Sequence, residues 1–230
     1  MARIYKLSLS GLKLLYKVRH HKGHGIHSPF VYNLIHNVIE EKKPYYAYED
    51  IRMFLSENFP KHIVRKDKYN RLLFRLINCF DVESILEIGA GTGERTLYLT
   101  APSRKIKCIC YESDIQKRRI AEDLYEKWGH FRNIEVVRDI YTECQGKFDC
   151  IFIDLNHFSE INDDFFAFIE NFYEEKTFLV IRGIRNRKRH KLIWSKISAT
   201  KKRTVKLDLF DVGIIFFRKD LYRWSYQISF

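Results

Sequence analysis

The stretch Ile85-Leu-Glu-Ile-Gly-Ala-Gly-Thr-Gly-Glu-Arg-Thr96 decides how the rest of this sequence is interpreted. Residues 85–88 predict a short buried strand, because branched apolar residues suit a sheet that is covered on both faces. Gly89, Gly91 and Gly93 follow, and glycine lets the backbone take positive φ and approach a ligand closely. A helical pattern comes next. The stretch therefore predicts a strand, a glycine turn and a helix whose first N–H groups can bind an anionic or polar group.

The glycine spacing differs from the dinucleotide-binding fingerprint, G-x-G-x-x-G, because Glu94 stands where the third glycine would be. An acidic residue, Glu87, stands two positions before the first glycine of the turn. This E-x-G-x-G-x-G pattern resembles motif I of the class I methyltransferases that use S-adenosylmethionine (SAM) and release S-adenosylhomocysteine (SAH). A structural turn or another nucleotide site is the alternative. The resemblance implies cofactor contacts from Glu87, Gly89, Ala90, Gly91, Gly93 and Thr96.

The composition is that of a globular protein. With 230 residues, 46% of them hydrophobic, the chain is long enough for one full core and an appendage. No apolar run approaches the roughly 20 residues of a membrane span, and the first residues lack the features of a signal peptide, so we expect a cytoplasmic protein. The five cysteines show no metal-ligand spacing and are odd in number, which favours reduced structural thiols.

The formal net charge of +12 is concentrated in two segments. Residues 182–203 contain ten Lys or Arg, residues 1–39 contain six, and neither segment contains Asp or Glu. Such segments present a solvated basic face or bind a polyanion, for which RNA is one candidate. In the N-terminal segment, residues 1–39, an apolar stripe at helical spacing favours a helix packed on the domain over one lying on a membrane or on nucleic acid. The stripe is formed by Tyr5, Leu9, Leu12 and Tyr16.

The predicted elements divide the chain into two parts. Residues 1–80 predict a helical extension or lid, in which Ser28 and Pro29 should start a helix that runs to about Glu40. From residue 82 strands and helices alternate, which predicts a parallel sheet with helices on both faces. Two final strands are joined by only two residues and must pair antiparallel. The strands are expected at 84–88, 106–111, 134–138, 148–153, 178–181, 204–210 and 213–218.

We therefore predict an α/β, Rossmann-like class I methyltransferase fold, with five parallel strands, a C-terminal antiparallel hairpin and a SAM-binding domain at 81–230. Open sheets of this kind bind ligands at the carboxyl ends of their strands. Glu112 stands at the second such end, where its two oxygens can accept both ribose hydroxyls, with Ser113 beside it. The resemblance places Asp139 and Ile140 against the adenine. Asp154 would lie beside the sulfonium methyl. Each carboxylate alone could instead be a helix cap.

Further stretches extend the resemblance over nearly the whole chain, to a group of bacterial methyltransferases best known from Bacteroidetes. This group is similar in turn to O-methyltransferases of the catechol type. The resemblance implies the fold and the cofactor but identifies no acceptor. It rests on His24-Gly-Ile-His27-Ser-Pro-Phe30, Ile153-Asp-Leu-Asn-His157, Trp194 and Leu207-Asp-Leu-Phe-Asp-Val-Gly-Ile-Ile-Phe-Phe217.

The chain departs from the catechol type at the metal site. Those enzymes hold a divalent ion with an Asp after the fourth strand and an Asp-Asn pair after the fifth. Asp154 matches the first position, but Arg182-Gly183 stands at the second. An arginine within about 4 Å would oppose a cation by roughly 4 kcal/mol per unit charge at an effective dielectric near 20. We therefore expect no catalytic metal.

Methyl transfer to a hydroxyl without a metal needs positioning and a base. His157 is the first candidate base, since imidazole titrates near neutral pH, and Asp154 is the second. Arg182 and Arg185 suggest an anionic group in a small-molecule acceptor. The loop at residues 24–30 is expected to cover the site through His27, Ser28 and Phe30. No metal is expected at its two histidines, His24 and His27, because the sequence offers no third ligand nearby.

Two alternatives to a small-molecule O-methyltransferase follow from the same residues. The basic segment 182–203 favours an RNA-directed methyltransferase. The motif used on adenine N6 is absent, because the fourth strand ends in Asp-Leu-Asn-His. Arg182, at a position where relatives are usually acidic, favours a SAM-binding protein that has lost catalysis. The helical N-terminal part could also serve a homodimer.

Overall fold

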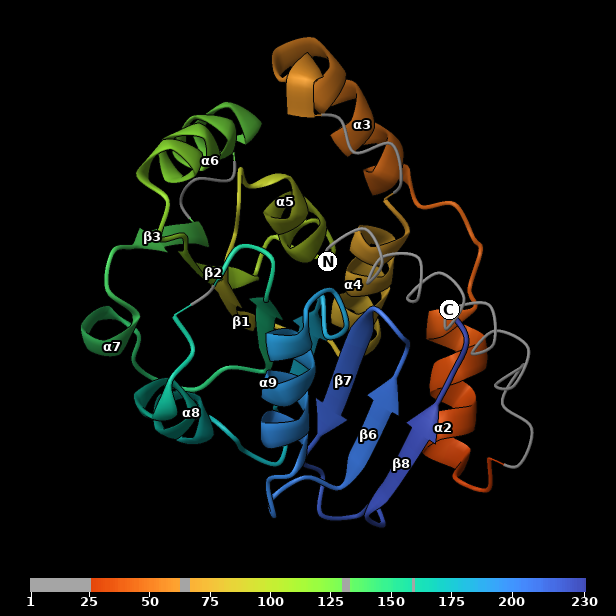
Figure 1. Ribbon diagram of the computed structural model, residues 1–230. Helices are drawn as coiled ribbons and strands as arrows, with labels where there is room; N and C mark the ends of the chain where they lie inside the picture. Colours follow the sequence, from red (N-terminus) through yellow and green to blue (C-terminus); the bar gives the residue numbers. More distant parts are fainter. Residues whose placement is uncertain (1–25, 63–66, 130–132, 159) are drawn as a thin grey trace.

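The computed structural model describes residues 26–62, 67–129, 133–158 and 160–230. They form three layers, in which one eight-stranded sheet lies between two groups of helices (Figure 1). The sheet has the order β3-β2-β1-β4-β5-β7-β6-β8. Its strands are β1 (Ser84–Ile88), β2 (Lys107–Tyr111), β3 (Ile134–Val137), β4 (Cys150–Asp154), β5 (Phe178–Arg182), β6 (Val205–Asp208), β7 (Val212–Phe216) and β8 (Trp224–Gln227).

The pairing confirms the predicted sheet and adds one strand. Strands β1 to β5 are parallel, and β7 lies antiparallel between β5 and β6. The hairpin connection has three residues instead of two, because β6 ends at Asp208, two residues earlier than predicted, while β7 begins one residue earlier, at Val212. The edge strand β8, parallel to β6, was not predicted. Its residues are mostly exposed, so it lacks the apolar alternation that marks a buried strand.

Helices cover both faces of the sheet because its central strands are apolar on both sides. Ile85 belongs to a core shared with the helices of residues 29–79, 94–100 and 115–128. Leu86 and Ile88 belong to the opposite core, against the helices of residues 163–170 and 188–198. The helices are α2 (Pro29–Leu34), the π-helix η1 (Ile35–Ile39), α3 (Tyr46–Asn58), the 3-10 helix η2 (Pro60–His62), α4 (Lys68–Cys79), α5 (Glu94–Thr100), α6 (Ile115–Trp128), α7 (Ile140–Glu143), α8 (Asp163–Glu170) and α9 (Lys188–Ser198).

The start of α2 is as predicted. The hydroxyl of Ser28 accepts a hydrogen bond from the N–H of Val31, and Pro29 occupies the first helical position. Helical structure then continues through η1 to Glu40. The N-terminal stripe at Tyr5–Tyr16 and His24 lie outside the described residues. The predicted lid role of residues 1–80 stays a prediction. Within the part of the chain that the structure describes, no helix is both long and apolar enough to cross a bilayer.

Candidate active site

The glycine turn after β1 has the predicted backbone. Gly89, Gly91 and Gly93 have φ of 84°, 66° and 91°, a region that glycine enters without steric cost. A Cβ at Gly93 would also come within 2.8 Å of the Tyr125 ring. The carbonyl of Tyr111 at the end of β2 accepts the N–H groups of Gly89 and Ala90, at 2.8 and 3.1 Å. The turn is therefore held against the next strand, and α5 begins directly after it.

Glu112 lies beside this turn, as predicted. Its side chain is buried, with the residue only 1% exposed. One carboxylate oxygen accepts the N–H of Gly91 at 2.7 Å, and the other accepts the N–H of Asp114 at 3.0 Å. A carboxylate can accept about four hydrogen bonds, so it keeps acceptor capacity. The exposed Ser113 follows it.

Below the turn, a buried arginine joins two buried carboxylates. Arg95 is 6% exposed, and its guanidinium lies 3.3 Å from a Glu87 oxygen and 2.5 Å from an Asp154 oxygen. Burial raises the pKa of Glu87, which Arg95 and a 2.6 Å hydrogen bond from the Thr96 hydroxyl oppose. The same guanidinium donates to the Gly89 carbonyl at 3.2 Å. Sequence reasoning missed this role of Arg95, although its position in the first turn of α5 was a signal.

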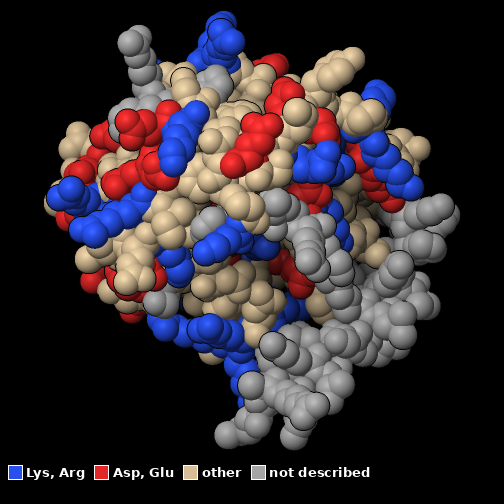
Figure 2. Space-filling model, turned by 90° about the horizontal axis from the view of Figure 1, so that it is seen from above, with Lys and Arg blue, Asp and Glu red and all other residues tan. Residues whose placement is uncertain are grey.

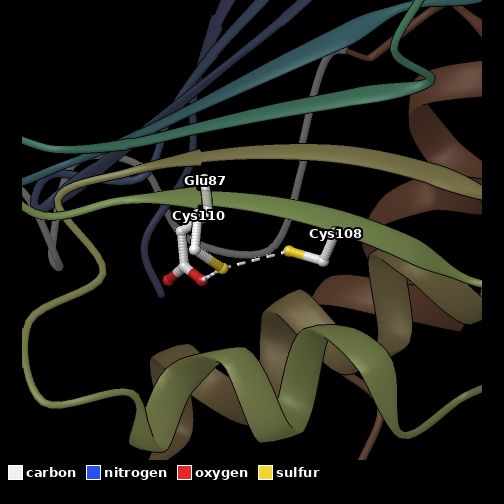
Figure 3. A group of neighbouring side chains, drawn as sticks. All are labelled: Glu87, Cys108 and Cys110. Atoms are coloured by element: carbon white, nitrogen blue, oxygen red, sulfur yellow. Dashed lines mark hydrogen bonds between the residues drawn. The ribbon is translucent and has the colours of Figure 1, made fainter. Parts of the chain in front are cut away.

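Two cysteines of β2 face Glu87 (Figure 3). The sulfur of Cys110 lies 3.5 Å from a Glu87 oxygen and 3.5 Å from the sulfur of Cys108. These three are the one group of potential metal ligands within the described ranges. Burial raises the pKa of Cys110 well above its usual value, which favours a neutral thiol, and Arg95 already supplies Glu87 with a positive charge. We therefore interpret the cluster as core hydrogen bonding. All five cysteines are free, as expected.

Asp154, at the end of β4, has partners on both oxygens. One oxygen faces Arg95 at 2.5 Å and Arg182 at 3.6 Å, and the other accepts the backbone and side-chain N–H groups of Asn156 at 2.9 and 2.8 Å. Burial acts to raise its pKa, but Arg95, Arg182 and the N–H of Asn156 act together against burial, and the pKa of Asp154 lies below its ordinary value. The carboxylate is thus ionised and nearly saturated with donors.

His157 packs against the glycine turn. A Cβ at Gly91 would meet its imidazole ring at 3.4 to 3.6 Å. The Nδ1 atom is buried and has no hydrogen-bond partner in the described structure. Burial lowers the pKa of His157 and outweighs the opposing effect of Asp154. The imidazole is therefore neutral at pH 7 and can accept a proton.

The first turn of α4 reaches the same edge of the sheet. The hydroxyl of Tyr69 donates to the carboxylate of Asp211, in the turn between β6 and β7. Burial, together with Asp211, raises the pKa of Tyr69, so the hydroxyl stays protonated. The guanidinium of Arg182 lies 5.6 Å from the centre of the Tyr69 ring. The sequence offered no signal for this contact, because it joins residues far apart in the chain.

Three predicted residues lie at the wrong end of the sheet, and their assignment to the active site is corrected. The Phe30 ring packs 5.1 Å from that of Phe216. Phe216 pairs with Phe178 at the first position of β5, so the loop lies at the amino ends of the parallel strands. His27 and Ser28 line a groove at that end, together with Phe30 and with Val205, the first residue of β6. The glycine turn lies at the carboxyl ends, so this loop cannot cover it.

The remaining predicted residues have other partners. The guanidinium of Arg185 forms two 2.6 Å contacts with the carboxylate of Asp208 and one of 2.7 Å with the Phe210 carbonyl, which ties it to the hairpin. Asp139 caps α7, accepting the N–H of Tyr141 at 2.9 Å, and is exposed at the end of β3. Ile140, next to it, is buried.

The strand order, the antiparallel β7 and the glycine turn after β1 together define the class I methyltransferase fold. No protein-family model and no curated protein matches the sequence. Solved structures do match over most of their length. The SAH-bound methyltransferase PaMTH1 of Podospora anserina has a TM-score of 0.60 and 12% identity, covering 84% of this chain and 98% of that one.

Two bacterial structures match in the same way. An O-methyltransferase from Bacillus cereus in complex with SAH has a TM-score of 0.55 and 18% identity, and the match covers 81% of this chain and 97% of that one. A putative caffeoyl-CoA O-methyltransferase from Staphylococcus aureus has a TM-score of 0.57 and 16% identity, and the match covers 81% of this chain and 96% of that one. At these identities the likeness establishes the fold.

Proposed function

We propose that this protein transfers the methyl group of SAM to an oxygen of a small acceptor that carries an anionic group, without a catalytic metal. The observation that carries the proposal is the glycine turn held against the buried carboxylate of Glu112. SAM supplies an electrophilic methyl group on a positively charged sulfur. The solved structures with the same fold support the choice of cofactor, because two of those described above contain SAH.

The residues at the turn fit the parts of this cofactor. Glu112 keeps acceptor capacity for ribose hydroxyls, and the glycines let the backbone approach a ligand. Glu87 and Thr96 are fully buried beneath the turn and contribute indirectly, because they hold Arg95 and the start of α5 in place. We also assign cofactor contacts to the remaining strand-end residues of the predicted set, Ala90, Ser113, Asp139 and Ile140.

We assign the base to His157 and an electrostatic role to Asp154. A base must be unprotonated and must have a free acceptor atom. Burial keeps His157 neutral, and its Nδ1 has no partner in the described structure. Asp154 fails the second condition, because donors already occupy both of its oxygens, and its lowered pKa makes it a weak base. Its negative charge still lies close to where a sulfonium would bind.

The contact between Arg182 and Asp154 supports transfer without a metal. The guanidinium nitrogen lies 3.6 Å from the carboxylate oxygen, so a positive charge already stands beside the candidate metal ligand. Arg182 is also the residue that we propose to attract the acceptor. Its side chain is 31% exposed, so it can contact solvent and a ligand, whereas Arg185 is tied to Asp208.

The first test is calorimetric titration with SAH, which needs no acceptor. Wild type should bind in the micromolar range, and Glu112→Ala should weaken binding at least tenfold, about 1.4 kcal/mol. Glu112→Gln, which keeps one acceptor oxygen, should lie between the two. The exposed Glu126→Ala on α6 is the matched control and should bind like wild type. Absence of binding by folded wild type would mean that the glycine turn is only architectural.

The second test measures methyl transfer from labelled SAM to phenols with and without a carboxylate or phosphate group, in the presence of EDTA. Wild type should prefer the anionic phenols, and Arg182→Gln should lose that preference while it still methylates neutral ones. Activity that disappears in EDTA and returns with Mg²⁺ would contradict the metal-free reaction. SAH binding without transfer to any acceptor would favour the alternative of an inactive SAM-binding protein.

An RNA acceptor is the second candidate, and the charge of α9 and the turn after it favours it. Exposed cations lie along this segment, at Lys188, Lys191, Lys201 and Lys202. Figure 2 shows a group of Lys and Arg side chains at the lower left of the view. RNA affinity that falls steeply with salt, and transfer to RNA, would support this candidate over a small molecule.

A further inference from the structure

A cavity lies between the N-terminal helices and the last residues of the chain. Its volume is about 620 Å³, which is within the range of small-molecule sites. The walls come from the end of η1 and the residues after it, from α4, and from Ser229 and Phe230. None of the residues assigned above to the cofactor or the acceptor lines it.

The charged side chains around this cavity are mainly basic. Five cations line it, against two carboxylates: Lys42, Lys43, Lys68, Arg71 and Arg75 against Glu40 and Glu41. Both carboxylates have partners of their own. Glu40 lies 3.2 Å from the imidazole of His36, and Glu41 accepts the Tyr45 hydroxyl at 3.0 Å and lies 3.7 Å from Lys43. Glu41 partly balances Lys43, so the excess positive charge of the wall comes mainly from Lys42 and Arg75, which have no carboxylate partner within the described residues.

Three of the cations lie on one face of α4. Lys68, Arg71 and Arg75 are spaced by three and four residues, which brings their side chains to the same side of a helix. Arg71 is paired with Asp67 at 2.7 Å. Lys68 donates to the backbone oxygen of Phe230 at 3.1 Å. The cavity thus has a basic wall that is built on a regular element.

Arg75 is the deepest of these cations, and it is only 6% exposed. Its Nε donates to the Val38 carbonyl at 2.5 Å and its Nη2 to the Ile39 carbonyl at 3.2 Å, so it caps the end of η1. Within the described residues no carboxylate pairs with it. A further side-chain hydrogen bond joins Arg75 to Tyr48. Because a guanidinium has five N–H donors and these three bonds use at most three, donors remain for a ligand in the cavity that Arg75 lines. A buried charge without a counter-ion favours binding of an anion.

We propose that this cavity binds a small, multiply anionic ligand of the phosphate class. Arg75 would contact it from the base, and Lys42 and Lys68 from the rim. The wall formed by Tyr69 and Phe230, whose ring centres are 5.7 Å apart, separates the cavity from Arg182. The site is therefore distinct from the proposed acceptor site, and its existence does not depend on methyl transfer.

The test is calorimetric titration of the full chain with inorganic pyrophosphate at constant ionic strength, with and without saturating SAH. Wild type should bind at one site with equal affinity in both conditions. The double variant Lys42→Gln/Lys68→Gln should bind at least tenfold more weakly. The control is Lys105→Gln/Lys107→Gln, which removes two exposed cations elsewhere and so changes the net charge equally. It should change the affinity less than twofold.

Three results would overturn the proposal. Equal weakening by both double variants would mean non-specific attraction to a basic protein. Loss of pyrophosphate binding in the presence of SAH would place the anion at the glycine turn instead. No binding by folded wild type at millimolar pyrophosphate would mean that the cavity has no such ligand.

Discussion

Replacement of Arg95 by methionine should strongly destabilise the fold. The guanidinium is 6% exposed and lies between the fully buried carboxylates of Glu87 and Asp154. Methionine fills a similar volume but leaves both carboxylates without this partner. Removing one partner of a buried ion pair costs about 3–5 kcal/mol, because the remaining charge stays buried.

We expect a loss of about 3–5 kcal/mol in the free energy of unfolding, and not twice that value, because each carboxylate keeps other partners. Asp154 retains Asn156 and the more distant Arg182. Glu87 retains the hydroxyl of Thr96. A loss of this size is a large part of the roughly 5–15 kcal/mol that stabilises a typical domain.

The loss should also depend on pH. Without Arg95, burial should raise the folded-state pKa of Glu87 further and should lift that of Asp154 above its unfolded value. A raised pKa in the folded state destabilises at high pH, and the penalty is relieved as pH falls through that pKa. The difference between wild type and variant should therefore shrink by at least about 1 kcal/mol between pH 8 and pH 5.5. His157, whose pKa Arg95 helps to lower, should change the difference in the same direction.

Urea unfolding followed by circular dichroism at several pH values measures these differences. The double variant Arg95→Met/Glu87→Gln should recover part of the loss, because it removes one of the two buried carboxylates that lose their arginine partner. Arg119→Met, at an exposed position on α6, is the control and should change stability by less than about 0.5 kcal/mol. A loss below about 1 kcal/mol in Arg95→Met, or a loss that is independent of pH, would refute this account of the buried cluster.

Three further predictions concern stability. Gly93→Ala should cost at least about 2 kcal/mol in chemical unfolding, because φ is 91° and the new Cβ would lie 2.8 Å from the Tyr125 ring; a neutral effect would contradict the geometry. Gly213→Ala should cost about 1–3 kcal/mol, since its Cβ would lie 2.4 Å from the Trp194 ring, and Gly213→Ala/Trp194→Phe should recover part of it. Burial lowers the pKa of His190, so thermal stability should fall as pH drops below about 6.5, and His190→Asn should make that fall shallower; an unchanged slope would be inconsistent with a buried neutral imidazole.

Local signals in the sequence were sufficient for the turn and for every strand of the sheet except the exposed edge strand β8. The strand at 84–88 has the predicted bounds, and Gly89, Gly91 and Gly93 have the positive φ that their positions required. These features depend on near neighbours: on apolar runs that suit a buried sheet, and on backbone conformations that other residues rarely adopt. Glu112 also lies where its place at a strand end predicted, because parallel strands present their carboxyl ends at one edge.

Long-range packing decided the rest of the candidate site. The sequence pattern assigned the loop of Phe30 to the active site, but aromatic packing on Phe216 holds it at the other end of the sheet. Tyr69 reaches Asp211 across 142 positions of the chain, and no local pattern encodes such a distance.

The sequence by itself determined the fold class, the glycine turn and the strand-end carboxylates, because each depends on short-range periodicity or on backbone sterics. Only the tertiary structure decided which charges meet. Arg95 could have faced solvent, yet burial places it between Glu87 and Asp154. Arg182 lies close enough to share Asp154, whereas Arg185 is held by Asp208. Ion pairing depends on a few ångströms between residues far apart in sequence, and only the packed chain sets those distances.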